Sequence, residues 1–326
     1  MTGGMRKVAT TGLLAGLLAV LAGCTTNSTA PRSPATLPPP PVGGTAQATG
    51  AGAPDLRAPG EIATGIDVPW GLAFLPGGDA LVAERDTARI LRIPGGGGQP
   101  REVYRVPGVD AGGEGGLLGL AVSPSYATDG YVYAYFTSAS DNRIARFRLD
   151  GTPEVIFEGI GKSGIHNGGR IAFGPDGMLY AGTGDAGERR SAQDPNDPNG
   201  KVLRLAPDGR PAPGNPAAGS PVYTLGHRNV QGIAWDGHGR MFAAEFGQNR
   251  FDELNLIEPG HNYGWPAVEG VGDTAGGKYT NPLVTWGTDE ASPSGIAIAA
   301  DVIYIAALRG SRLWTVPIHP SAGPVT

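Results

Sequence analysis

A short apolar segment with alanine at its third position recurs five times after residue 60, and each copy is followed by further apolar segments. The copies lie at residues 71–74, 119–122, 170–173, 232–235 and 295–298. Second segments follow at 80–83, 131–136, 178–181, 241–244 and 302–307, and third segments at 90–93, 144–149, 201–205, 253–257 and 313–317. Apolar runs of this length, bounded by glycine and proline, are typical of β-strands. The pattern predicts five three-stranded units.

The spacing of the copies predicts how these units pack. They begin 48, 51, 62 and 63 residues apart, as do propeller blades with loop insertions. A small sheet with two apolar faces cannot bury both by itself, and radial stacking around an axis buries them. A β-sandwich with similar hairpins is the alternative, but it requires no long fixed period. We therefore expect an all-β propeller with an opening strand near residues 61–65, either as a five-bladed ring or with a final blade missing.

The amino-acid composition agrees with a propeller, and the net charge argues against one class of binding partner. The 326 residues include 55 glycines and 30 prolines, which favours many short strands over long helices. The formal net charge is −5 and the charged residues are scattered along the chain. A nucleic acid is therefore not expected as a partner.

The first 59 residues predict export and tethering instead of a folded core. Arg6 and Lys7 precede an apolar run at 8–22, and Leu-Ala-Gly-Cys at 21–24 matches the lipobox of bacterial lipoproteins. Residues 1–24 are expected to be a lipoprotein signal peptide, with Cys24, the chain's single cysteine, as the lipidated residue. The alternative is a signal anchor with a chance cysteine. Residues 25–59, rich in Pro, Thr and Ala, are expected to be a disordered tether, and residues 60–326 the propeller. This predicts an extracytoplasmic protein, lipid-anchored to the bacterial cell membrane.

Polar residues that could carry chemistry stand at the ends of the predicted blades. His166 precedes the third inner strand and is followed by two glycines, which let a ligand approach the backbone closely. A neutral imidazole there could accept a proton from a substrate hydroxyl. Arg228 and Asn229 stand at the matching place in the fourth copy and could bind carboxylates or carbonyls. The alternatives are a histidine bonded only to backbone and an arginine in a salt bridge between blades.

A loop at 245–253 follows the second strand of the fourth copy and combines carboxylates with a glycine. Exposed carbonyls and carboxylates suit calcium, although a solvated acidic loop is equally compatible with this composition. Glu114 enters the second blade and Arg309 leaves the second strand of the fifth, so both could face the same axis. The Gly-x-Gly-x-x-Gly at 182–187 is not followed by a helix, which argues against a dinucleotide site.

Taken together, these motifs resemble those of the bacterial pyrroloquinoline-quinone-dependent soluble sugar dehydrogenases, the glucose/sorbosone dehydrogenase group that includes aldose sugar dehydrogenases. The resemblance covers roughly residues 60–318. The motifs that carry it are Pro-Trp-Gly-Leu-Ala-Phe at 69–74, Gly-Gly-Leu-Leu-Gly at 115–119, His-Asn-Gly-Gly-Arg at 166–170, Gly-Lys-Val-Leu-Arg at 200–204, Gly-His-Arg-Asn at 226–229 and Asn-Tyr-Gly-Trp-Pro at 262–266.

The resemblance implies a six-bladed propeller in which His166 is the general base for hydride transfer from a sugar's anomeric hydroxyl to the quinone. It implies that Arg228 contacts cofactor and substrate, and that Asn229 and Arg309 bind the cofactor. Glu114 stands at a cofactor-binding position where the family usually has glutamine. Because the family's last blade has no counterpart in this sequence, the propeller is expected to be truncated at its C-terminal end.

The resemblance also implies two calcium ions. The backbone carbonyls of Gly247 and Gln248 would hold the ion that polarises the quinone, and Glu253 and the backbone of Tyr263 would hold a second, structural ion. The substrate would be an aldose, with an electron acceptor that the sequence does not identify. A lipid-anchored propeller that binds ligands without catalysis is the main alternative, and a metal-dependent lactonase is a third.

Overall fold

The computed structural model describes residues 53–57 and 59–318 and contains five β-sheets. The first sheet consists of β1 (Pro69–Phe74), β2 (Ala80–Glu84), β3 (Arg89–Ile93) and β4 (Arg101–Arg105), and the second of β5 (Leu117–Val122), β6 (Val132–Thr137), β7 (Asn142–Phe147) and β8 (Glu154–Ile160). The third consists of β9 (Ile171–Phe173), β10 (Leu179–Gly182), β11 (Lys201–Leu205) and β12 (Val222–Leu225). The fourth consists of β13 (Val230–Trp235), β14 (Met241–Glu245), β15 (Phe251–Ile257) and β16 (Val284–Gly287), and the fifth of β17 (Pro293–Ala299), β18 (Val302–Ala307) and β19 (Arg312–Pro317). The helices are α1 (Tyr126–Asp129) and the 3₁₀ turn η1 (Ser191–Gln193).

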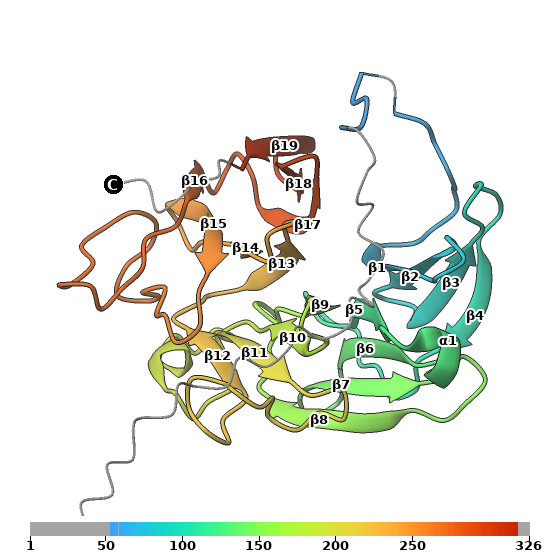
Figure 1. Ribbon diagram of the computed structural model, residues 1–326, viewed down its shortest axis with the longest axis horizontal. Helices are drawn as coiled ribbons and strands as arrows, with labels where there is room; N and C mark the ends of the chain where they lie inside the picture. Colours follow the sequence, from blue (N-terminus) through green and yellow to red (C-terminus); the bar gives the residue numbers. More distant parts are fainter. Residues whose placement is uncertain (1–52, 58, 319–326) are drawn as a thin grey trace, which may run out of the picture. The chain divides into compact units, whose positions relative to one another are not determined.

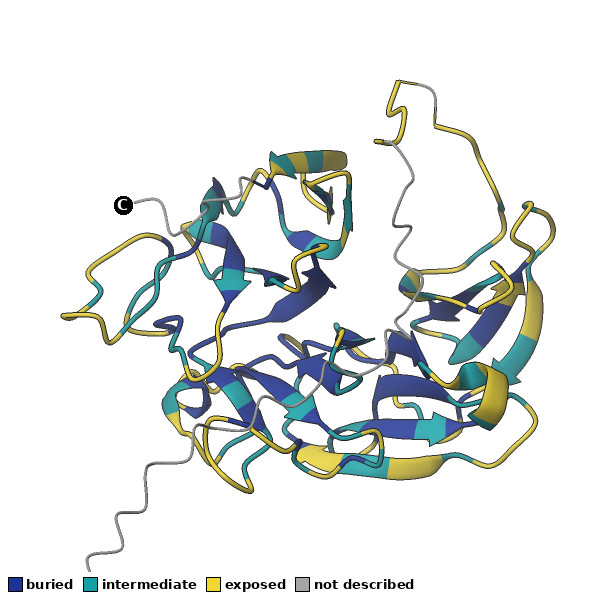
Figure 2. Ribbon diagram, viewed as in Figure 1, coloured by how far each residue is buried: buried dark blue, intermediate teal, exposed yellow. Residues whose placement is uncertain are grey.

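Each sheet is an antiparallel meander whose strands are hydrogen-bonded in sequence order. The first strands β1, β5, β9, β13 and β17 pack side by side in that order, as Figure 1 shows. Figure 2 shows that the inner strands β5 and β13 are buried, whereas the outer strand β8 largely faces solvent. The propeller prediction is therefore confirmed, with five blades in the described residues.

Apolar side chains from neighbouring sheets form the core. Leu81 and Ile90 of the first sheet and Leu117 and Ala134 of the second are fully buried in one cluster. Glycine opens the recurring segment in four of the five copies, and at three of them, Gly71, Gly119 and Gly232, the backbone of the next inner strand comes too close for a side chain. A Cβ on Gly71 would collide with the carbonyl of Leu118 in the next inner strand. This close approach explains the glycine at these three positions, whereas the third copy has Arg170 at the equivalent place.

Two details of the strand prediction are corrected. The fourth strands β4, β8, β12 and β16 were not predicted, because they lie at the sheet edges, where half-exposed sequences carry a weak apolar signal. The opening strand at 61–65 was predicted but is absent. Ile62 is 64% exposed, and its carbonyl accepts a single bond from the N–H of Gly98. An extended segment without a neighbouring ladder is not a strand.

The first sheet leaves one apolar face without a covering sheet among the described residues. Leu72 and Phe74 of β1 are 53% and 58% exposed, whereas the equivalent positions of β5 and β13 are buried. The predicted signal peptide, Cys24 and most of the predicted tether lie outside the described residues. Within those residues, no helix is long and apolar enough to cross a membrane.

Candidate functional site

The meander topology brings the predicted site residues to one end of the sheets. In an antiparallel pair, the residues before the first strand and those after the second lie at the same end. Glu114, His166 and Arg228 precede inner strands, and Gln248 and Arg309 follow second strands. Four of the five sheets also shift register near the start of the inner strand, where bulges commonly redirect side chains. The site is therefore assembled from short loops on a rigid frame.

His166 is held in a left-handed backbone conformation with φ of 55°. Its N–H donates to Glu114 Oε2 at 2.7 Å, and its carbonyl accepts from the N–H of Ala186 at 3.1 Å. A Cβ on Gly184 would collide with that carbonyl, so only glycine fits there. Hydrogen bonds to both the N–H and the carbonyl of His166 thus fix a backbone conformation that a non-glycine residue rarely adopts.

The His166 ring lies between a carboxylate and a guanidinium. Its Nδ1 is 2.6 Å from Asp185 Oδ1, and its Nε2 is 2.6 Å from Arg228 Nη2. Since a guanidinium only donates, Nε2 accepts and the ring proton is assigned to Nδ1, which donates to Asp185. The imidazole is therefore neutral, with its basic nitrogen directed at Arg228. The alternative of a histidine bonded only to backbone is excluded.

Asp185 is the partner that the sequence did not reveal. It is 1% exposed, and its carboxylate also accepts from Gly187 N–H at 2.8 Å and Trp265 Nε1 at 2.8 Å. Burial raises its pKa, but the bonds from His166, Gly187 and Trp265 outweigh burial and hold the pKa below its usual value. Asp185 is thus an anion at neutral pH. The sequence signal that could have identified Asp185 is its position in a glycine-rich loop directly after β10, because this loop lies at the same end of the hairpin as His166.

Arg228 connects the histidine to the loop after β14. Its Nε donates to Gln248 Oε1 at 3.0 Å and its Nη1 to the carbonyl of Phe246 at 3.0 Å. Its guanidinium carbon lies 5.7 Å from the centre of the Trp265 ring. Burial lowers its pKa, while the nearby carboxylates, Asp185 foremost, oppose this effect. No carboxylate of the described residues forms an ion pair with Arg228, so the predicted alternative of a salt bridge between blades is wrong.

Asn229 is fully buried beside the glycines that follow His166. Its Oδ1 accepts from Gly168 N–H at 2.9 Å, whereas its Nδ2 has no hydrogen-bond partner in the described part of the chain. An unpaired buried donor costs about 1–3 kcal/mol unless something else accepts from it. This donor fits the predicted role of Asn229 in binding an anionic, carbonyl-rich cofactor.

The backbone of the loop at 246–251 fits the predicted cation. Glu269 Oε1 accepts from the N–H of Gln248 at 2.7 Å and that of Asn249 at 2.8 Å. In a trans peptide the carbonyl points opposite to the N–H, so the carbonyls of Gly247 and Gln248 point away from Glu269. No described residue donates to either carbonyl. Two outward carbonyl oxygens are the ligands that calcium takes from backbone.

Glu253 lies elsewhere, in a buried polar cluster beneath that loop. Its carboxylate accepts from Gly270 N–H at 2.7 Å and Asn255 Nδ2 at 3.1 Å, and it meets Glu245. Burial raises the pKa of both glutamates to about 8. Asn255 Oδ1 has no partner, so the cluster offers oxygen donors that suit a cation.

The predicted second calcium site is only partly assembled. Tyr263 lies near the same cluster, where its ring stacks on His227 at 4.7 Å, and His227 Nδ1 is 2.8 Å from Glu245 Oε2. No hydrogen bond joins the Tyr263 backbone to Glu253 among the described residues, and the Tyr263 N–H donates to the carbonyl of Leu225. Nor do these residues contain a group of three His, Cys, Asp or Glu that could hold a metal. The role of Glu253 and Tyr263 in calcium binding stays a prediction.

Arg309 follows β18, at the same end of the sheets as His166 and Arg228. Its side chain is exposed and is not paired with a carboxylate in the described residues. The charges of Arg228 and Arg309 both lower the pKa of Asp252, although burial of that carboxyl raises it overall. Both guanidinium groups therefore lie within electrostatic range of one buried carboxylate. The Glu114 carboxylate lies in the same region, because it accepts from the N–H of His166 and its charge raises the pKa of Arg228.

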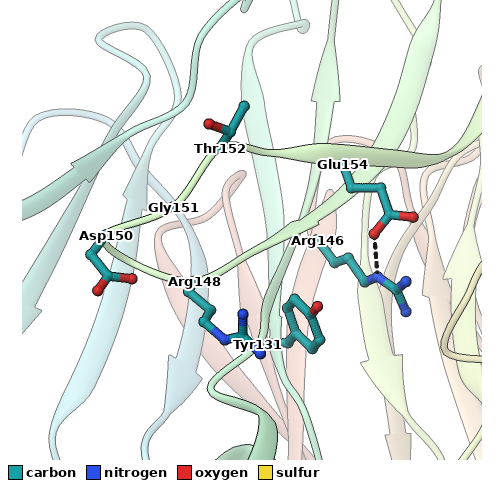
Figure 3. A pocket seen from close by; sticks show the side chains of 7 residues that line it. All are labelled: Tyr131, Arg146, Arg148, Asp150, Gly151, Thr152 and Glu154. Carbon is teal, nitrogen blue, oxygen red and sulfur yellow. Dashed lines mark hydrogen bonds and ion pairs between the residues drawn. The ribbon is translucent and has the colours of Figure 1, made fainter.

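A separate surface pocket of about 380 Å³ lies on the outer part of the second sheet (Figure 3). Arg146 and Arg148 flank the Tyr131 ring there, at 5.0 and 4.8 Å. Arg146 is already paired with Glu154, and Arg148 donates to the carbonyl of Asp129. The pocket contains none of the predicted site residues, so we place the chemistry at the loop end of the sheets.

Known proteins are similar to this chain in both sequence and fold. The Glucose / Sorbosone dehydrogenase family matches residues 66–318. The chain is 32% identical over 283 residues to quinoprotein glucose dehydrogenase B of Acinetobacter calcoaceticus, covering 74% of this chain and 59% of that protein. It is 30% identical over 220 residues to the aldose sugar dehydrogenase YliI of Escherichia coli K12, covering 62% and 59%. The chain thus spans 59% of the length of both relatives.

A solved structure is more similar still. The PQQ-bound form of the aldose sugar dehydrogenase from Streptomyces coelicolor is 56% identical, with a TM-score of 0.78 over 81% of each chain. The family match extends across all five sheets and the loops that carry His166, Asp185 and Arg228. The chain therefore belongs to the glucose/sorbosone dehydrogenase family.

Proposed function

We propose that this chain oxidises an aldose at its anomeric hydroxyl, with His166 as the general base and with pyrroloquinoline quinone and calcium as cofactors. One observation carries the proposal: a neutral, buried imidazole is oriented by Asp185, and its basic nitrogen faces the site. Family membership supports the substrate class, and the PQQ-bound Streptomyces relative supports the cofactor.

The imidazole is prepared to accept a proton. Nε2 carries the lone pair, and Arg228 donates to it at 2.6 Å. A sugar hydroxyl would compete with Arg228 for this lone pair and lose its proton to it as its hydride leaves. The Asp185 carboxylate, 2.6 Å from Nδ1, would stabilise the imidazolium that forms.

The remaining residues bind and orient. The buried Nδ2 of Asn229 and the guanidinium groups of Arg228 and Arg309 would donate to oxygens of the quinone and its carboxylates. The carbonyls of Gly247 and Gln248 would hold the calcium ion. When bound, the quinone supplies the hydride-accepting carbonyl, which calcium polarises as a Lewis acid.

The test titrates purified, cofactor-free protein with pyrroloquinoline quinone in the presence of calcium, followed by absorbance. Turnover of an aldose is then measured with an artificial electron acceptor. We expect His166→Ala to abolish turnover while quinone binding persists. His238→Ala is the matched control, because His238 is exposed in the β13–β14 turn at the other end of a neighbouring sheet. Turnover that survives in His166→Ala would remove His166 as the base.

A propeller that binds ligands without catalysis is the second candidate. Glu114 favours it, because a carboxylate that acts on Arg228 would weaken the binding of an anionic quinone. A titration that shows no quinone binding to the wild-type chain would support this alternative. For either function we propose a lipid anchor at Cys24.

A further inference from the structure

One carboxylate gathers an unusual number of backbone donors. Glu269 Oε1 accepts from four successive N–H groups, those of Gln248, Asn249, Arg250 and Phe251, at 2.7, 2.8, 2.9 and 3.3 Å. Burial raises the pKa of Glu269, but these four bonds outweigh it and lower the pKa below its usual value. The group is therefore ionised at neutral pH, and a concave run of N–H groups of this kind is a typical anion-binding arrangement.

A surface ion pair does not explain this position. Arg250, in the same loop, places its guanidinium 5.1 Å from the Phe251 ring, and it forms no ion pair with Glu269. All hydrogen bonds to this carboxylate from the described residues thus come from the backbone. Its own place is fixed from the other side, because the next residue, Gly270, donates its N–H to the buried Glu253 at 2.7 Å.

A second carboxylate secures the start of the same loop. Asp252 Oδ1 accepts from Gly247 N–H at 2.9 Å, and its Oδ2 accepts from Ser292 N–H at 2.6 Å. A Cβ on Gly247 would collide with the carbonyl of Phe251, so the loop closes tightly upon itself. With every N–H from Gly247 to Phe251 turned inward, the carbonyls of Gly247 and Gln248 must face outward.

This arrangement reaches the proposed base through the Gln248 side chain. Gln248 Oε1 accepts from Arg228 Nε at 3.0 Å, and Arg228 donates to His166 at 2.6 Å. An anion on the N–H side of a peptide also polarises its carbonyl and strengthens it as a cation ligand. The loop backbone therefore couples Glu269 to both the cation site and Arg228.

We propose that Glu269 is a positioning residue. Its carboxylate holds the loop at 246–251 in the conformation that directs the Gly247 and Gln248 carbonyls toward calcium and the Gln248 side chain toward Arg228. This inference rests on the proposed function for the identity of the cation, but not for the structure of the loop.

The experiment compares wild type with Glu269→Ala, Glu269→Gln and the control Glu258→Ala. Glu258 is an exposed glutamate whose carboxylate lies 3.5 Å from Nδ1 of His261. Amide hydrogen exchange is measured first, on protein free of calcium and quinone. We expect Glu269→Ala to lose protection at the amides of 248–251, Glu269→Gln to lose less, and the control to match wild type. Wild-type protection in Glu269→Ala would overturn the inference.

Calcium affinity of the cofactor-free protein is measured next by calorimetry with calcium chloride. Loss of a residue that supports metal ligands typically weakens binding by about 10- to 100-fold, and we expect a Kd increase in this range for Glu269→Ala. An unchanged Kd would also overturn the inference. If wild type binds no calcium, the proposed function fails, and the exchange rates decide the role of Glu269 alone. Should Glu269→Ala not fold, Glu269→Gln carries both measurements.

Discussion

Replacing Asp185 with asparagine tests the proposed base most directly. Three donors point at this carboxylate: His166 Nδ1 and Gly187 N at Oδ1, and Trp265 Nε1 at Oδ2. An amide has one acceptor oxygen, so neither orientation of the asparagine satisfies all three. With oxygen at the Oδ1 position the indole N–H is unpaired, and with the amide reversed its NH₂ faces His166 and Gly187.

The size of the effect follows from these two orientations. In the first, His166 keeps its tautomer but loses a buried anion at 2.6 Å. A hydrogen bond to a charged group contributes about 1.5–3 kcal/mol, which corresponds to a fall in kcat of about 10- to 150-fold. In the reversed orientation the ring proton moves to Nε2, and the loss approaches the ~10⁴-fold known for a comparable histidine–aspartate pair.

The assay measures kcat and KM of the protein loaded with quinone and calcium, for an aldose and an artificial electron acceptor. We expect kcat to fall and KM to change little, because Asp185 is 1% exposed and cannot touch the sugar. Nitrogen NMR of His166 reports the tautomer in each variant. Asp176→Asn is the control, since Asp176 lies in the β9–β10 turn, at the far end of the same hairpin, and forms an ion pair with Arg204 of β11. An Asp185→Asn enzyme with the wild-type kcat would refute the reasoning.

Three further changes have defined outcomes. Lys201→Met should lower the free energy of unfolding in urea by about 3 kcal/mol, because Lys201 Nζ donates to the carbonyls of Ser191, Ala192 and Asn199 inside the third sheet. Burial lowers the pKa of Lys201 from 10.5 in the unfolded chain to about 8 in the folded one, so between pH 8 and 10.5 the folded state binds fewer protons than the unfolded state. The free energy of unfolding of the wild type should therefore rise with pH in this window. The same rise in Lys201→Met would assign the pH dependence to another group. Glu114→Gln should keep most turnover, since its amide oxygen can still accept from His166 N–H, whereas Glu114→Ala should lower kcat; equal kcat values for the two variants would contradict this. Cys24→Ser should move the expressed protein from the membrane to the soluble fraction, and unchanged membrane association on fractionation would argue against lipidation.

The five-blade repeat could be predicted from the sequence because its cause is local. In three copies the recurring segment opens with a residue that must be small where the next sheet approaches, as at Gly71 against the backbone of Leu118. The alternation of turns and apolar runs then fixed the first three strands of each sheet. Edge strands such as β4 escaped prediction, because they are half-exposed and their apolar signal is weak.

The functional partners of His166 were decided by the tertiary structure. Asp185 lies 19 residues from His166, and Trp265 lies 80 residues from Asp185, yet both belong to one buried network. Their meeting depends on the paths of loops in two different blades, which no periodicity encodes. The sequence by itself determined the first three strands of each sheet and which loops share an end, because both follow from local patterns and antiparallel connection. The orientation of an imidazole or of a carbonyl is set by contacts between distant loops, and only the folded chain contains these.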